Sequence, residues 1–310
     1  MVENNVCAVI VTFHPSARML ENIPNVFAQV QGLVVVDNGS HVENLNRIRI
    51  KARLDRFQLI ENGENLGIAE ALNQGVLWAK TEGYQWVVLF DQDSRITEHF
   101  VDSMLNAWRE HPQRERVVTV LPRYIDALNG FEVFCHRAKD GGPFVSMTSG
   151  SLLPIWIFDR IGWFPSEYFI DCVDFEYSLR ARAAGYLIAS SKDAILFHSP
   201  GKPTTLQLFG ITLLRTSNHS AERRYYMIRN RVAMARRHFR TFPVWTIKNW
   251  MLIGMDVVKM LIGERSRRAK LAAMLNGLID GIAGRMGPVV RTSISNRDSE
   301  TSTSGVMFHK

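Results

Sequence analysis

The stretch WVVLFDQDS, residues 86–94, runs five large apolar residues directly into two aspartates separated by one glutamine. An apolar run of this length, bounded by polar residues, predicts a strand that is buried on both faces. The preceding sequence alternates similar runs with helical spacing of apolar residues: strands are predicted at Val6–Phe13, Gly32–Asp37 and Phe57–Glu61, and helices at Ala17–Gln29 and Gly67–Glu82. This alternation predicts an α/β fold with a mostly parallel sheet flanked by helices.

Each predicted strand is followed by polar side chains at its carboxyl end: Thr12, Asp37, Asn62 with Asn65, and Asp91 with Asp93. Ligands of parallel sheets bind beyond the carboxyl ends of the strands, so these residues predict one binding site at this edge. The sequence contains neither GxGxxG nor GxxxxGK[ST], which argues against a dinucleotide site and a P-loop.

The charge divides the 310-residue chain into parts. Residues 1–214 carry 19 Lys and Arg against 24 Asp and Glu, whereas residues 215–291 carry 16 against 4, a net charge of +12. We therefore expect a catalytic or binding domain at 1–214, a basic helical region at 215–291 and a disordered polar tail at 292–310. Three cysteines without a disulfide or metal spacing, and the lack of a signal peptide, favour a cytoplasmic location.

The basic region also contains many large apolar residues. Its longest apolar stretch, Trp250–Ile262, is broken by Asp256 and Lys259 and is shorter than the roughly 20 residues that span a bilayer. The combination fits an anionic membrane surface. A nucleic-acid partner is not expected, because no nucleic-acid motif accompanies the charge, and the alternative remains that these helices only pack on the main domain.

Two clusters of acidic residues suggest chemistry. Asp91 and Asp93 offer hard oxygen ligands to Mg²⁺ or Mn²⁺ and to a diphosphate held by it, although acids at strand ends also cap turns. Further on, FIDCVDFEYSLR places Asp171, Asp174 and Glu176 at a helix start. There they either favour the helix dipole or supply a general base for a substrate hydroxyl.

The ordered motifs TFHP, VDNGS, NLGIAEALNQG, FDQDS, TSGS, DFEYSLRARAAGY and FHSPG resemble the family 2 glycosyltransferases of the GT-A fold. The resemblance covers roughly residues 6–202. The FIDCVDFEYSLRARAAGY block and Arg223–Arg231 look more narrowly like bacterial rhamnosyltransferases, which use dTDP-L-rhamnose to build O-antigen and other cell-surface polysaccharides.

The resemblance implies a role for each candidate residue. Donor-binding residues would be Thr12 and Asp37 at the base and ribose, Asn65 and Gly67 near the nucleotide, and Asp91; metal ligands would be Asp93, Asp91 and His198. The catalytic base would be Asp174. The family's Glu-Asp-x-Asp is Val173-Asp174-Phe175-Glu176 here, so Asp171 and Glu176, with Ser149 of the TSGS turn, become candidates on the acceptor side. Some acceptor contacts are also expected within 123–145.

The implied reaction is a metal-dependent displacement that inverts the anomeric carbon of dTDP-β-L-rhamnose. The acceptor would be a saccharide on a polyprenyl diphosphate, which implies a peripheral enzyme on the inner face of the cell membrane. A UDP-sugar donor and a non-catalytic nucleotide-sugar-binding protein stay open as alternatives. A nucleotidyltransferase is disfavoured by the lack of a glycine-rich, lysine-bearing N-terminal loop.

Overall fold

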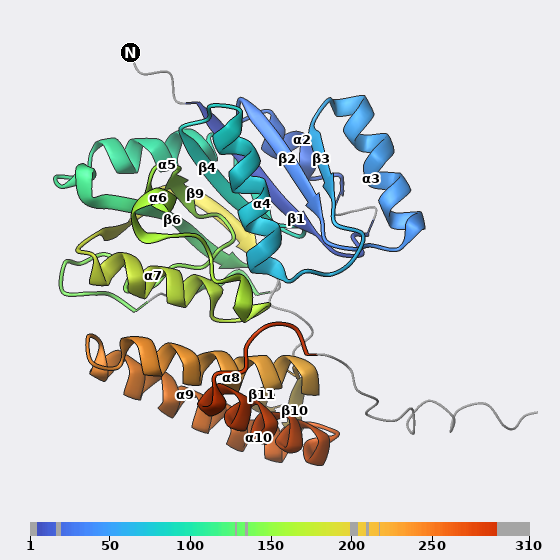
Figure 1. The fold of residues 1–310 in the computed structure, drawn as a ribbon, viewed down its shortest axis with the longest axis vertical. Helices are drawn as coiled ribbons and strands as arrows, with labels where there is room; N and C mark the ends of the chain where they lie inside the picture. The colour runs from blue at the N-terminus through green and yellow to red at the C-terminus, as the bar shows by residue number, and fades with distance from the viewer. Residues whose placement is uncertain are drawn as a thin grey trace, which may run out of the picture.

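The computed structural model describes residues 5–16, 20–127, 129–133, 136–198, 204–208, 211–216 and 218–289, with the backbone alone at 198, 204–208 and 211–215. The strands of the α/β domain are β1 (Val6–Thr12), β2 (Gly32–Asp37), β3 (Gln58–Glu61), β4 (Trp86–Asp91), β5 (Arg95–Ile96), β6 (Val117–Asp126), β7 (Glu132–Val133), β8 (Leu152–Pro154) and β9 (Leu187–His198). Its α-helices are α2 (Ile23–Phe27), α3 (Val42–Asp55), α4 (Ile68–Thr81), α5 (Phe100–Arg109), α6 (Ile157–Ile161) and α7 (Val173–Ala183). Three more helices and a hairpin follow (Figure 1).

The sheet of the described residues has the order β3-β2-β1-β4-β8-β6-β9-β5, with β7 beside β6. The first four of these strands are mutually parallel, which brings the carboxyl ends of β1, β2 and β4 to one edge. The other half is mixed: β8 runs antiparallel to both of its neighbours, while β6 and β9 are parallel. The expectation of a mostly parallel sheet therefore holds for the N-terminal half only.

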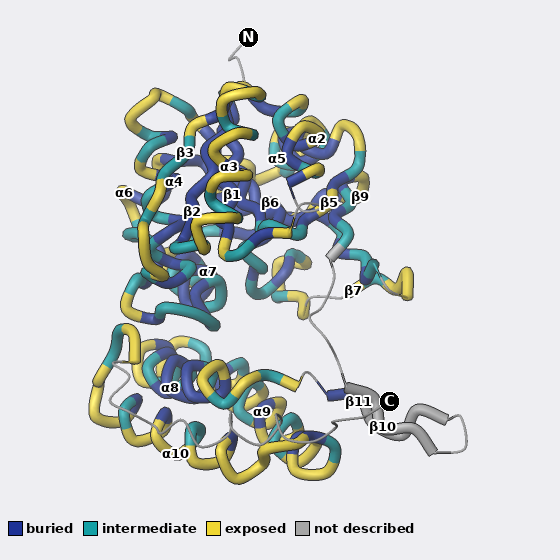
Figure 2. The backbone as a smooth tube through the Cα atoms, turned by 90° about the vertical axis from the view of Figure 1, so that its right-hand side faces the viewer, coloured by how far each residue is buried: buried dark blue, intermediate teal, exposed yellow. Residues whose placement is uncertain are grey.

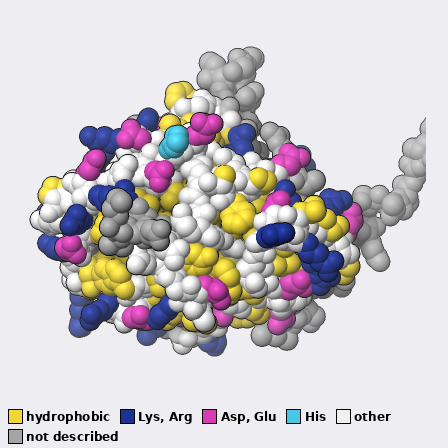
Figure 3. Space-filling model, turned by 90° about the horizontal axis from the view of Figure 1, so that it is seen from above, with side chains coloured by type: hydrophobic (Ala, Val, Ile, Leu, Met, Phe, Trp, Pro, Cys, Tyr) yellow, Lys and Arg dark blue, Asp and Glu magenta, His cyan; other side chains and the backbone are white. Residues whose placement is uncertain are grey.

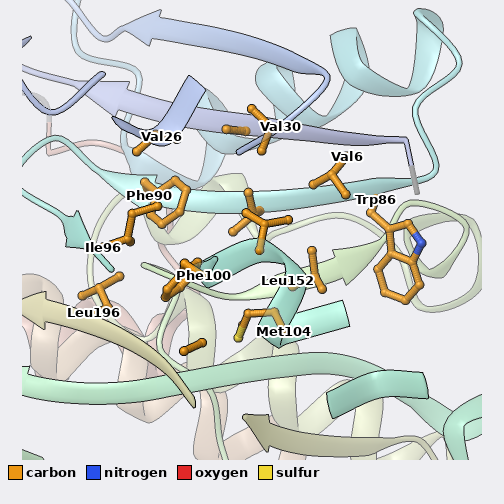
Figure 4. Packing of buried hydrophobic residues seen from close by; sticks show 14 of the residues in the cluster. Val6, Val26, Val30, Trp86, Phe90, Ile96, Phe100, Met104, Leu152 and Leu196 are labelled. Carbon is orange, nitrogen blue, oxygen red and sulfur yellow. The ribbon is translucent and has the colours of Figure 1, made fainter. Parts of the chain in front are cut away.

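The two faces of β1 bury separate apolar clusters. Val6, Ala8 and Ile10 face the side covered by α2, α3 and α5, and the alternate residues from Cys7 to Val11 face α4, α6 and α7. Figure 4 shows the first cluster, in which Phe90 and Phe100 lie against Ile96. Because β1, β2 and β4 are apolar on both faces, their sequences show continuous rather than alternating hydrophobicity.

Of the helix predicted at Ala17–Gln29, the described residues show α2 at Ile23–Phe27, with turns at Glu21 and Asn22 before it and at Ala28 and Gln29 after it. Pro24 lies in its first turn, where the missing N–H costs no hydrogen bond, but a proline cannot continue a helix from an earlier turn. Residues 17–19 lie outside the described part.

The C-terminal region consists of the hairpin β10 (Thr204–Leu208) and β11 (Ile211–Thr216), followed by α8 (Ala221–His238), α9 (Pro243–Gly263) and α10 (Arg267–Ala283). The predicted boundary at 214/215 falls inside β11. The predicted tail at 292–310 lies outside the described residues. In the described part of the chain, no helix is both long and apolar enough to cross a membrane.

α8 is the central helix of this region, and it lies between α7 and α10 (Figure 1). Figure 2 shows its backbone largely buried, whereas α9 and α10 are mostly exposed. α10 approaches α8 closely because it presents two glycines: a Cβ on Gly277 would lie 2.4 Å from the Tyr225 carbonyl oxygen, and one on Gly281 would lie 2.7 Å from Val232 Cβ. This contact fixes α10 against α8.

α8 is joined to the α/β domain through two buried polar residues. The Asn230 amide donates hydrogen bonds to the carbonyl oxygens of Tyr168, Ile170 and Asp171 at 2.9, 2.7 and 2.9 Å. Arg229 donates to the carbonyl oxygens of Glu167 and Tyr168, each at 3.1 Å. Both side chains are almost completely buried, so the carbonyls they satisfy would otherwise have no water to bond.

Replacing Asn230 with alanine is expected to lower the free energy of unfolding by about 2–3 kcal/mol, because buried carbonyl groups lose their donors. Asn276, an exposed asparagine on α10, is the matched control, and its change to alanine should stay within about 0.5 kcal/mol. Urea unfolding followed by circular dichroism measures both. Equal effects of the two substitutions would contradict the role of Asn230.

Candidate active site

The ends of β1 and β2 hold Thr12 and Asp37 side by side. Thr12 Oγ1 donates to Asp37 Oδ1 at 3.1 Å, and Ser40 donates to the same carboxylate through its hydroxyl (2.5 Å) and its backbone N–H (2.9 Å). Thr12 and Asp37 are buried. The structure therefore brings these two predicted residues together, and the two hydrogen bonds from Ser40 fix the carboxylate.

A network of asparagines joins this corner to the start of α4. Asn38 donates to Asn65 Oδ1 at 3.0 Å and accepts from Asn62 and from the Leu66 N–H, both at 3.1 Å. Asn65 Oδ1 also accepts from the Gly67 N–H at 2.9 Å. These four hydrogen bonds fix the conformation of the loop that leads into α4.

Gly67 has φ +88°, and a Cβ there would lie 2.6 Å from the Phe169 carbonyl oxygen. The same oxygen accepts from the Ile68 N–H at 2.7 Å. Only glycine fits this approach. The first amides of α4 are thus already bonded within the protein, and the loop before α4 rests directly on the turn before α7.

The turn formed by Asp91, Gln92 and Asp93 at the end of β4, called the DQD turn below, is held by Ser149. The Asp91 N–H donates to Ser149 Oγ at 3.2 Å, and the hydroxyls of Ser149 and Ser94 lie 2.6 Å apart. Gln92 turns toward β1, where its Oε1 accepts from the Phe13 N–H at 2.8 Å. Ser149 is buried, so the structure shows this predicted acceptor-side residue supporting the turn that carries Asp91 and Asp93.

Asp171 and Asp174 lie on a turn with unusual backbone angles. Phe169, Asp171 and Cys172 have φ of 64°, 65° and 64°, a region that costs a non-glycine residue of order 1 kcal/mol or more. The turn lets α7 begin at Val173, so that Asp174 lies in its first turn. Arg223 of α8 pairs with Asp171 at 3.1 Å. The contact with Arg223 therefore helps α8 to hold the turn in this strained backbone conformation.

Burial, with smaller contributions from the charges of Asp171 and Asp91, raises the pKa of Asp174 to about 7, although a hydrogen bond from the Phe175 N–H at 2.9 Å acts in the opposite direction. The coupling to Asp91 shows that the acids of β4 and α7 share one electrostatic environment. A carboxyl group with a pKa near neutrality is suited to accept a proton.

The residues at the DQD turn fit a divalent cation. Asp91 and Asp93 are half-buried and present hard oxygen donors, and the repulsion among Asp91, Asp171 and Asp174 would be relieved by positive charge. In the described part of the chain, no three His, Cys, Asp or Glu converge on a metal position. His198 ends β9 opposite Asp126, and its side chain lies outside the described part.

Glu176 requires a correction to its predicted acceptor-side role. Its carboxylate is fully buried and pairs with Arg180 and Arg237 at 2.8 Å and with His238 at 3.4 Å. Burial alone would raise the pKa of Glu176, but these partners hold it below its ordinary value. Glu176 points into the interface between α7 and α8, because it lies two positions after Asp174 and therefore on another face of the helix.

Several site residues were not predicted from the sequence. Arg223, Arg229 and Asn230 reach the catalytic turn from about 60 positions away, and only the density of arginines in Arg223–Arg231 hinted at them. His14 and His41 stack at 4.1 Å, and the His41 N–H donates to His14 Nδ1 at 3.1 Å. The histidine pair closes the loops after β1 and β2, and no spacing in the sequence signals it.

Comparison with known proteins identifies the domain. Residues 7–134 match the family described as Glycosyl transferase family 2. The protein named dTDP-rhamnosyl transferase RfbF of Shigella flexneri is 27% identical over 302 residues, covering 92% of this chain and 98% of that protein. Its similarity thus extends through Asp174 and the C-terminal helices.

Two solved structures have the same fold. The mannosyltransferase PcManGT from Pyrobaculum calidifontis, solved with GDP-Man and Mn²⁺, superposes with a TM-score of 0.55 at 15% identity, covering 91% of this chain and 88% of that one. TarS of S. aureus gives a TM-score of 0.56 at 16% identity, covering 91% of this chain and 49% of TarS. Residues 7–134 thus match family 2 glycosyltransferases, the structure has the GT-A fold, and the chain is similar over most of its length to a dTDP-rhamnosyl transferase.

Proposed function

We propose that the protein is an inverting rhamnosyltransferase that moves L-rhamnose from dTDP-β-L-rhamnose to a hydroxyl of a lipid-linked saccharide, in the synthesis of O-antigen or another cell-surface polysaccharide. The observation that carries this proposal is the similarity to a dTDP-rhamnosyl transferase along 92% of the chain. The geometry supports it, because a carboxyl group with a raised pKa on α7 is coupled to the DQD turn after β4.

In this proposal the donor lies along the carboxyl ends of β1, β2 and β4. Thr12 and Asp37 contact the base and ribose, the loop of Asn65 and Gly67 lies near the nucleotide, and Asp91 and Asp93 hold the cation. A bound Mg²⁺ or Mn²⁺ would neutralise charge on the departing diphosphate. His198 is the further candidate ligand, and Arg223, which the charge of Asp91 also influences, adds a cation at the same site.

Asp174 is the general base of the proposed reaction. Its carboxylate removes the proton from the acceptor hydroxyl, and the acceptor oxygen attacks the anomeric carbon on the face opposite the diphosphate. The configuration therefore inverts and yields an α-rhamnoside. Asp171, paired with Arg223, is the candidate that orients the acceptor beside Asp174.

The C-terminal helices are proposed to rest on the inner face of the cell membrane. α9 exposes Val244, Met251 and Val258 at intervals of seven residues, and α10 exposes Leu275 and Ile282 at the same interval, so each helix shows an apolar stripe. The exposed Arg265, Arg267 and Arg268 flank these stripes, as expected for contact with anionic lipid. By contrast, acidic and basic side chains are interspersed on the opposite end of the molecule (Figure 3).

A donor panel tests the proposed reaction. Binding and slow hydrolysis of dTDP-rhamnose, UDP-glucose, UDP-N-acetylglucosamine and GDP-mannose are measured with Mg²⁺, with Mn²⁺ and with EDTA. Selective use of dTDP-rhamnose that EDTA abolishes is expected. Selectivity for a UDP sugar would replace the donor and keep the mechanism. Binding of a donor without any hydrolysis would favour the non-catalytic alternative, and no binding of any donor would contradict the proposed function.

Asp174→Asn is expected to lower kcat about 10³-fold and to leave the affinity for dTDP nearly unchanged. In the unaltered protein, kcat/KM should rise with pH through about 7, because only the ionised form of Asp174 accepts a proton. The same variant should be more stable to urea, with a larger gain at pH 8 than at pH 5. The reason is that a raised carboxyl pKa makes the ionised folded state unfavourable above the unfolded pKa. Full activity of the variant would exclude Asp174 as the base.

Vesicle sedimentation tests the membrane contact. The double variant Leu275→Asp with Ile282→Asp alters side chains that are 57% and 62% exposed and should reduce binding to vesicles containing phosphatidylglycerol at least tenfold. Leu54 of α3, which is 74% exposed on the α/β domain, gives the control Leu54→Asp. The proposed surface would be contradicted if the double variant and Leu54→Asp lost vesicle binding equally, or if neither of them lost it.

A further inference from the structure

A cavity of about 520 Å³ lies between the loop 136–145, the start of α7 and the first three turns of α9. Its walls are largely aromatic: Phe144 stacks on Trp245 with centroids 6.1 Å apart, and Phe175 meets Trp245 edge-on at 5.9 Å. Val244 and Leu252 continue the apolar wall along α9. This volume would hold the apolar part of a medium-sized ligand.

The rim of the cavity carries one sign of charge. Arg137, Lys139 and Lys248 line it together with His136, and no acidic residue belongs to the lining. Within the described part of the chain, none of these three cations takes part in an ion pair with an acidic side chain. Uncompensated cations around aromatic walls complement an anion that carries an apolar group.

Arg182 bonds the loop side of the cavity to α7. Arg182 of α7 donates to the Phe144 carbonyl oxygen at 2.7 Å, pairs with Asp140 at 2.9 Å and lies over the Phe144 ring at 5.2 Å. These contacts hold the loop against α7.

The cavity borders the catalytic turn at two points. Phe175 directly follows Asp174. Asn249, at the other end, accepts a hydrogen bond from Arg231 at 3.0 Å, and the charge of Arg231 acts on Cys172. A ligand seated here would lie beside the first turn of α7, with its apolar part against the aromatic walls and its anionic part near the cations of the rim.

We propose that this cavity binds the carrier of the acceptor, an amphiphile in which a phosphate or diphosphate joins an apolar chain to the sugar that receives the transfer. The inference rests on the proposed function, and it names where the acceptor's phosphate and first apolar segment lie. The cations at the rim hold the phosphate groups, the aromatic walls hold the start of the chain, and the remainder of the chain follows the apolar stripe of α9.

The test uses the full chain and farnesyl diphosphate as probe, titrated calorimetrically without detergent and with the donor site saturated by dTDP. Farnesyl diphosphate should bind, and inorganic diphosphate should bind at least tenfold more weakly. Lys248→Ala should weaken farnesyl diphosphate binding about tenfold, because one charge-assisted contact is lost. Lys259→Ala, which removes an exposed lysine further along α9, is the matched control and should change the affinity less than twofold.

Three results would overturn the proposal: no binding of farnesyl diphosphate, equal binding of inorganic diphosphate, or equal effects of Lys248→Ala and Lys259→Ala. Arg137→Ala with Lys139→Ala provides an independent pair of exposed side chains and should weaken binding in the same direction. The affinity for dTDP, titrated separately in each variant, reports on the proposed donor site alone. If dTDP does not bind while farnesyl diphosphate still binds, the result counts against the proposed function. The assignment of the cavity to the carrier of the acceptor is then unaffected.

Discussion

The amide of Asn230 is the contact on which the turn before α7 depends. The backbone carbonyl groups of Tyr168, Ile170 and Asp171 all accept hydrogen bonds from the Asn230 side chain. They converge on it because the turn that contains them has left-handed backbone angles at non-glycine residues. Such a turn persists only where its surroundings compensate for its strain. The start of α7, the direction of Asp174 and the support of the loop at Gly67 all follow from that turn.

The sheet and its binding edge could be predicted from the sequence because a strand buried on both faces shows itself in its own residues. Thr12, Asp37 and Asp91 follow apolar runs, and parallel pairing brings them together without further information. The turn at Phe169–Cys172 could not be predicted, since its angles are imposed by Arg229 and Asn230, about 60 residues later. Glu176 was misassigned for the same reason: its neighbours Arg237 and His238 become visible only when α8 is placed.

The positively charged residues of the C-terminal region form two groups, one buried and paired and the other exposed. Arg224 and Lys270 are buried, and both pair with the buried Glu264, at 2.9 and 2.7 Å. Arg229 donates hydrogen bonds to two backbone carbonyl groups of the α/β domain. These cations are paired inside the protein, whereas the arginines around Ser266 are exposed. Net charge alone therefore overstates the surface that is open to a partner.

The dependence of the catalytic turn on α8 bears on how such enzymes diversify. A region that supplies two buried residues to the base-bearing turn is not an interchangeable appendage, even though it follows the catalytic domain in the chain. Recombination between related proteins would preserve the turn only if the turn and α8 were inherited together, while the outer faces of α9 and α10, which contact neither, could vary independently.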